Sequence, residues 1–290
     1  MPLNSTDEEL RLSAANDLAE KLKLERRQIL ELRELFRNMS ADMFAFVSET
    51  GNAPQASIYE DDLRGILAKQ GRRTGAAFSG QVTDFLEETD EDDQIIEELA
   101  VIAAISGLAV AELIAKLKND IRVKNQEFIA TNVAGDTAFI TRTNQKEMDA
   151  AVASAKAAII GDGRIPTNRE VARISSNDFK NRGFARSPTI ATTFTQKTAE
   201  GVKAIERDTF FGARNGLPAV IADVQQLEEK EIWVTVGDEV VRQSHVAADF
   251  TEKEGNGWIV QGELLRFPGD PNGSISNIAN CRCSAQLVIE

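Results

Sequence analysis

Residues that bind metal ions or carry out redox chemistry are scarce in this chain. Its 290 residues include one histidine and two cysteines. All three of them, His245, Cys281 and Cys283, lie near the C-terminal end of the sequence. Two cysteines separated by one residue in a cytoplasmic protein are expected to be reduced thiols rather than a structural disulfide. Any metal or thiol chemistry is therefore expected in this terminal segment.

Long apolar runs are also missing. No stretch reaches the roughly 18 apolar residues that a membrane helix needs, and the most apolar run, 99–117, is interrupted by Ser106, Gly107 and Glu112. The first residues are acidic and show no signal-peptide pattern. We therefore expect a protein that folds in a cytoplasm and does not contact membranes.

Positive charge is in short supply, since 33 basic residues face 46 acidic ones and the net charge is −13. Affinity for nucleic acid depends on neutralising phosphates, so the chain as a whole is expected to be repelled by DNA. One segment is basic, and it is interleaved with Phe179 and Phe184. Its basic residues are Arg164, Arg169, Arg173, Lys180, Arg182 and Arg186. We expect these residues to contact DNA or an acidic protein surface, and packing against acidic residues of the chain itself is an equal alternative.

A dense acidic block occupies residues 84–98. It lacks the glycine and the spaced glutamate of a calcium-binding EF-hand loop. A helix start exposed to solvent is therefore favoured over a Ca²⁺ or Mg²⁺ site.

The spacing of apolar residues predicts an α+β protein, in which a largely helical body precedes a small α+β module. Helices are expected over 6–48, 58–69, 99–118, 120–160 and 189–215, with a loop at 71–77 and a strand at 137–143 as an alternative to helix. Strands are expected at 231–236, 258–260, 264–267 and 284–290, with a short helix at 240–249. Two glycines and a proline within 161–166 indicate a boundary. The predicted parts are a helical body (1–160), a basic linker (161–186) and a terminal module (187–290).

His245, Asp249, Cys281 and Cys283 are the candidate metal ligands. His245 and Asp249 are four residues apart, which places them on one face of a helix. Two thiolates, an imidazole and a carboxylate can form a tetrahedral Zn²⁺ site. The alternative is a packed network, in which the cysteines face one side of a strand and His245 bonds to the turn at 268–271.

A catalytic role is a third possibility for this segment. A nuclease would use His245 as general base or acid, with Arg242 or Arg282 stabilising a phosphate. A single histidine near two arginines is weak support, because both arginines could equally form ion pairs.

The terminal segment also resembles a known family. Trp233, Thr235, Asp238, Val241, Arg242 and His245 are followed by Gly262–Glu263, by Pro268–Gly269–Asp270–Pro271 and by Asn280–Cys281–Arg282–Cys283. The order and spacing of these elements are similar to the C-terminal pattern of the phage Mu protein F-like family, the minor head proteins of tailed bacteriophages. The resemblance covers residues 187–290. An Arg-Thr-Glu-Thr element of many members has no counterpart at 190–195, where Thr192 and Phe194 replace its arginine and glutamate.

The resemblance implies a non-enzymatic role in building the phage head. Members bind the portal protein during procapsid assembly, and the major capsid protein, a scaffolding protein and phage DNA are further expected partners. The expected location is inside the head of the virion, after assembly in the host cytoplasm. A nuclease- or transferase-like enzyme carried in the head is the alternative, and the loss of the charged element disfavours it.

Overall fold

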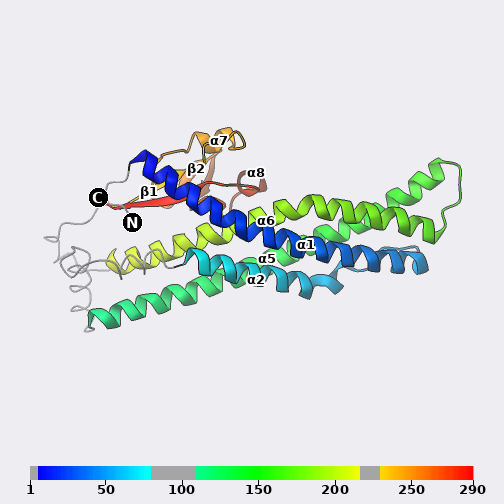
Figure 1. The fold of residues 1–290 in the computed structure, drawn as a ribbon, viewed down its shortest axis with the longest axis horizontal. Coiled ribbons are helices and arrows are strands. Elements are labelled where there is room, and N and C mark those ends of the chain that lie inside the picture. Colours follow the sequence, from blue (N-terminus) through cyan, green and yellow to red (C-terminus); the bar gives the residue numbers. More distant parts are fainter. Residues whose placement is uncertain (1–5, 80–108, 216–228, 290) are drawn as a thin grey trace. The chain divides into compact units, whose positions relative to one another are not determined.

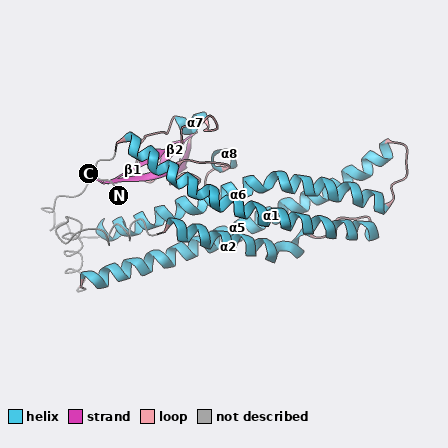
Figure 2. Ribbon diagram, viewed as in Figure 1, coloured by secondary structure: helices cyan, strands magenta, loops and turns pink. Residues whose placement is uncertain are grey.

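The computed structural model describes residues 6–79, 109–215 and 229–289. They form an α+β fold in which long helices precede a few short strands (Figures 1 and 2). The helices are α1 (Asp7–Thr50), η1 (Ala56–Tyr59), α2 (Glu60–Phe78), α5 (Val110–Gly161), α6 (Asn168–Asn215), α7 (Gln243–Val246) and α8 (Ile275–Ile278). The strands are β1 (Glu229–Val234), β2 (Trp258–Val260), β3 (Glu263–Leu265) and β4 (Ser284–Ile289).

Helix α1 starts at a capping box. The backbone N–H of Glu9 donates to Thr6 Oγ1 at 3.3 Å, and the backbone N–H of Thr6 donates to Glu9 Oε2 at 2.7 Å. This reciprocal pair satisfies two N–H groups that the first helical turn leaves without partners. The acidic first turn also matches the positive end of the helix dipole. The helix predicted over 6–48 is therefore confirmed.

Two of the predicted interruptions are absent. Residues 71–77 belong to α2, and residues 137–143, for which a strand was the alternative, belong to α5. Around this segment of α5, buried positions recur at helical spacing, among them Val133, Thr137, Ile140, Asn144 and Met148. The β-branched residues that suggested a strand at 137–143 are thus accommodated by the buried face of a helix.

Helix α6 begins earlier than predicted. The Thr167 hydroxyl caps it, accepting the backbone N–H of Glu170 at 3.3 Å. The segment predicted as a basic linker is therefore helical from Asn168 onward, and Pro188 lies inside the helix instead of starting it. In the turn before Pro188, the Ser187 hydroxyl donates an additional hydrogen bond to the Gly183 carbonyl at 2.8 Å.

The chain divides into two compact units. The first contains Met1–Leu22, Arg73–Ile129 and Thr195–Glu290, and the second contains Lys23–Arg72 and Ala130–Phe194. This division differs from the sequence boundaries at 160 and 186, because α1, α5 and α6 each supply residues to both units. Among the described residues, no helix is long and apolar enough to cross a bilayer. The acidic block 84–98 lies outside the described residues.

The second unit is a packed group of helical segments. Phe36 of α1 and Phe179 of α6 are fully buried and meet edge to face, with ring centroids 6.0 Å apart. Gly183 allows this approach, since a Cβ atom there would lie 2.4 Å from Phe36 Cγ. The Ser40 hydroxyl donates to the Ser176 carbonyl at 2.8 Å. Aromatic packing and a buried hydrogen bond thus join α1 to α6 within this unit.

The first unit contains all four strands. β1 pairs antiparallel with β4, with Trp233 opposite Ala285, and β2 pairs antiparallel with β3, with Trp258 opposite Leu265. Leu10 and Ala14 of α1 join Val234 and Val288 in one buried cluster. The N-terminal part of α1 therefore packs against the sheet formed by β1 and β4.

Candidate functional site

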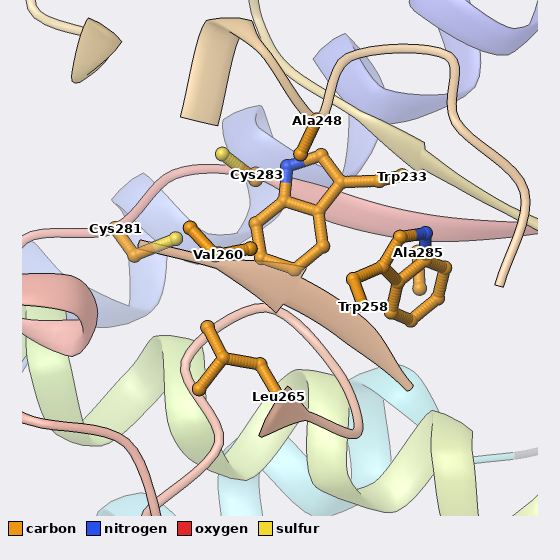
Figure 3. Packing of buried hydrophobic residues seen from close by; sticks show 8 residues of the cluster. All are labelled: Trp233, Ala248, Trp258, Val260, Leu265, Cys281, Cys283 and Ala285. Carbon is orange, nitrogen blue, oxygen red and sulfur yellow. The ribbon is translucent and has the colours of Figure 1, made fainter. Parts of the chain in front are cut away.

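The candidate site lies in a small apolar core of the terminal module. Trp233, Ala248, Trp258, Val260, Leu265, Cys281, Cys283 and Ala285 form this core, which Figure 3 shows from close by. The two tryptophan rings meet edge to face, with centroids 5.5 Å apart. Apolar side chains of the module therefore enclose both cysteines, and both are free thiols.

Helix α7 positions His245. The helix has only four residues, so its own hydrogen bonds hold it weakly. The Arg242 guanidinium anchors it by donating to the Ala279 carbonyl, just before the cysteines. The His245 ring then stands edge to face against Trp233, with centroids 5.5 Å apart.

A turn at Asn280 positions the cysteines. Asn280 has φ of 54°, a left-handed conformation that asparagine tolerates better than most residues. The chain after it extends into β4, so that Cys281 and Cys283 face inward and Arg282 faces outward. The Arg282 guanidinium pairs with Asp238 at 3.3 Å.

Both sulfurs lie beside one ring nitrogen. His245 Nδ1 is 3.4 Å from Cys283 Sγ and 3.6 Å from Cys281 Sγ. All three side chains are buried, with exposed fractions of 1–2 %. They are the group among the described residues whose ligand atoms converge closely enough to hold a metal ion, lying within 4.8 Å of one another.

The two thiols titrate as a pair. Hydrogen bonding from Cys283 lowers the pKa of Cys281 well below its ordinary value, against the effect of burial and with a further contribution from His245. The hydrogen bond to Cys281, together with burial, raises the pKa of Cys283 well above its ordinary value. Cys281 is therefore the more acidic thiol of the pair.

Asp249 does not belong to this group, so the predicted four-ligand set is wrong in that member. Helix α7 ends at Val246, and the following turn separates Asp249 from the face that carries His245. The Asp249 carboxylate accepts the backbone N–H of Thr235 at 2.8 Å and pairs with Arg11 at 2.9 Å. The Asp249 carboxylate therefore links the loop after β1 to α1.

The turn at 268–271 is likewise not the partner of His245. Gln196 of α6 donates to its Pro268 carbonyl at 3.4 Å. Inside the turn, Asp270 is fully buried and its carboxylate binds Arg266 and the backbone N–H of Asn272. Burial raises the pKa of Asp270, but the hydrogen bonds from Arg266 and from the backbone N–H of Asn272 together outweigh it, and the pKa lies below its ordinary value. The turn is thus a structural element of the module.

The six basic residues predicted to contact DNA or an acidic surface fall into two groups in the structure. Arg164 pairs with Glu170, Arg182 pairs with Asp178, and Arg186 pairs with Glu147. Arg169, Arg173 and Lys180 lie on α6 at spacings of four and seven residues, which places them on one helix face. Within the described part of the chain, these three form no ion pair.

Sequence reasoning missed a buried ion network beside the module. Glu200 Oε1 lies 2.7 Å from Lys21 Nζ and 2.9 Å from Lys203 Nζ. Lys203 also pairs with Asp17 at 2.7 Å. Lys21, Glu200 and Lys203 are each at most 1 % exposed.

This network holds the last strand. The backbone N–H of Ala285 donates to Glu200 Oε2 at 3.0 Å, and the Ser284 hydroxyl lies 2.8 Å from Asp17 Oδ2 and 3.1 Å from Glu200 Oε1. A signal that could have found the network is the i, i+3 spacing of Glu200 and Lys203 on a helix. The same spacing is common on solvated faces, so it does not predict burial.

The arrangement limits the chemistry available to the thiol–imidazole group. A nucleophile and its base must both reach a substrate, whereas these side chains are enclosed by the core of the module. The geometry is suited to binding an ion or to holding segments together. No family model, curated protein or solved structure matches this chain.

Proposed function

We propose that this protein is a minor head protein of a tailed bacteriophage, which binds the portal protein during procapsid assembly without acting as an enzyme. The observation that carries the proposal is the convergence of the motif segments. Residues from four separate segments, Trp233, His245, Glu263 and Cys283, take part in one small module.

The motif residues outside the core support the same proposal. Glu263 accepts the backbone N–H of Ser274 at 2.8 Å and the Asn277 side-chain amide at 2.9 Å. Arg242 and Arg282, which a nuclease would need to bind a phosphate, are paired with Ala279 and Asp238. These contacts favour a module whose motif maintains its shape, as an assembly protein requires, over a site that binds substrate.

The test of this proposal is co-purification of the full chain with the portal protein of its own phage. We expect a complex that survives gel filtration, because an assembly partner needs an interface of about 1,000 Å² or more. A portal protein from an unrelated phage serves as the control and should not be retained. Separate elution of the two folded proteins would contradict the proposal.

Contact with packaged DNA is assigned to Arg169, Arg173 and Lys180, whose charges are not neutralised by ion pairs within the described residues. Double replacement Arg169→Glu and Arg173→Glu should weaken binding to duplex DNA. It should also reduce the slope of log K against log salt by about 2, since each phosphate contact contributes about 0.9. Fluorescence anisotropy at several salt concentrations measures both quantities.

The matched control for this experiment is Arg142→Glu, at an exposed arginine of α5. It changes the net charge without altering the α6 face, so its salt slope should stay close to that of the unaltered protein. A double variant with an unchanged slope would remove these residues from DNA binding and leave the portal interaction as a separate question.

A further inference from the structure

We propose that His245 Nδ1, Cys281 Sγ and Cys283 Sγ bind one Zn²⁺ ion inside the terminal module. The inference goes beyond the role in head assembly and does not depend on it. It rests on the positions of three buried side chains.

The two nitrogen–sulfur distances fit edges of a zinc tetrahedron. Zinc lies about 2.3 Å from a thiolate sulfur and about 2.0–2.1 Å from an imidazole nitrogen. At a tetrahedral angle these bond lengths place nitrogen and sulfur about 3.5–3.6 Å apart. The observed separations from His245 Nδ1 are 3.4 Å to Cys283 Sγ and 3.6 Å to Cys281 Sγ.

Hydrogen bonding alone accounts for this arrangement poorly. An imidazole Nδ1 carries either one proton or one lone pair, so it makes one good hydrogen bond. Here two sulfurs converge on that single atom, inside an apolar core. A cation between the three atoms binds all of them at once, and it balances the charge of two thiolates.

The ligand types select zinc among the common metal ions. Thiolate and imidazole ligands suit Zn²⁺, whereas Mg²⁺ and Ca²⁺ require oxygen ligands. Asp249 is engaged by Thr235 and Arg11, so among the described residues the protein supplies three ligands. Three protein ligands are typical of zinc sites whose fourth position holds a water molecule.

The ion would join two segments of the terminal module. α7 carries His245, and the extended residues before β4 carry both cysteines. Arg242 already links these segments at Ala279. Zinc would add a second link within the core, beside Trp233.

The first experiment is elemental analysis of the full chain, purified without chelators after growth in zinc-supplemented medium. We expect about one zinc per chain. Cys281→Ser combined with Cys283→Ser should reduce the zinc content at least tenfold. Asp249→Asn is the matched control, and it should retain the zinc of the unaltered protein. A folded protein without zinc, or a double cysteine variant with full zinc, overturns the proposal.

A second measurement covers the case in which the double variant does not fold. The unaltered protein, stripped and reloaded with Co²⁺, should show thiolate-to-cobalt charge-transfer absorption and the intense visible bands of a tetrahedral site. Zinc should displace these bands and raise the melting temperature of the stripped protein, because an ion that binds only the folded state stabilises it. Octahedral cobalt spectra without charge transfer overturn the proposal. Neither measurement involves the portal protein, so a failure here leaves the proposed function untouched.

Discussion

Glu200→Ala should lower the free energy of unfolding by about 3–5 kcal/mol. Removing one partner of a buried ion pair leaves the other charge without compensation, and the cost is of that size. Here the loss removes the carboxylate that Lys21 pairs with, and leaves Lys203 with Asp17 alone. The backbone N–H of Ala285 also loses its acceptor. Chemical denaturation of the full chain measures the change.

Asp178→Ala is the matched control for this substitution. It removes a carboxylate from an i, i+4 pair with Arg182, on the same helix but at the surface. Exposed pairs contribute about 0–1 kcal/mol, so a small effect is expected. Equal effects of the two substitutions would contradict the role assigned to the buried network.

The same network predicts how stability depends on pH. Burial alone would raise the pKa of Glu200, but Lys203 and Lys21 outweigh it, and the folded-state pKa lies below the ordinary value of 4.5. A carboxylate of this kind contributes its full stability above pH 4.5 and loses it as the pH falls through the folded-state pKa. Glu200→Ala should therefore reduce the loss of stability on acidification.

Trp233→Ala should destabilise the terminal module by about 3–5 kcal/mol, the range found for replacing a fully buried aromatic residue. Its ring contacts both Trp258 and His245, so the cavity would open the core at its centre. Loss of near-ultraviolet circular dichroism at a lower denaturant concentration reports the effect. The far-ultraviolet signal of the long helices should change less.

Ile259→Ala in β2 is the comparison for this variant. Ile259 lies one residue after Trp258 and is 69 % exposed. Its substitution should change the stability by about 0.5 kcal/mol or less. A similar loss in both variants would mean that Trp233 does not organise the core.

The helices could be predicted from the sequence where interactions between residues close together in the chain determine the structure. Thr6 and Glu9 identify the start of α1 from sequence alone. The loop expected at 71–77 and the strand considered at 137–143 were wrong, because packing against neighbouring helices overrides local preference. The helix expected from 189 begins at Asn168 instead and contains Pro188, since a long, packed helix accommodates one missing N–H.

The candidate site was predictable in part. The rarity of histidine and cysteine pointed to His245, Cys281 and Cys283, which the fold brings together. Asp249 was predicted to be a metal ligand from its helical spacing to His245. It does not share a helix face with His245, because α7 ends at Val246, three residues before Asp249. Glu200 was missed, because sequence spacing does not distinguish a buried ion pair from one in solvent. Burial is decided by segments distant in the chain, here those carrying Lys21 and Ser284.

The cluster of Leu10, Ala14, Val234 and Val288 has a consequence for biosynthesis. The ribosome releases the first helix long before it makes the last strand, and at roughly 5–20 residues per second the interval is on the order of tens of seconds. During that time the apolar stripe of the nascent helix has no native partner. The module can therefore form only after β4 has been synthesised.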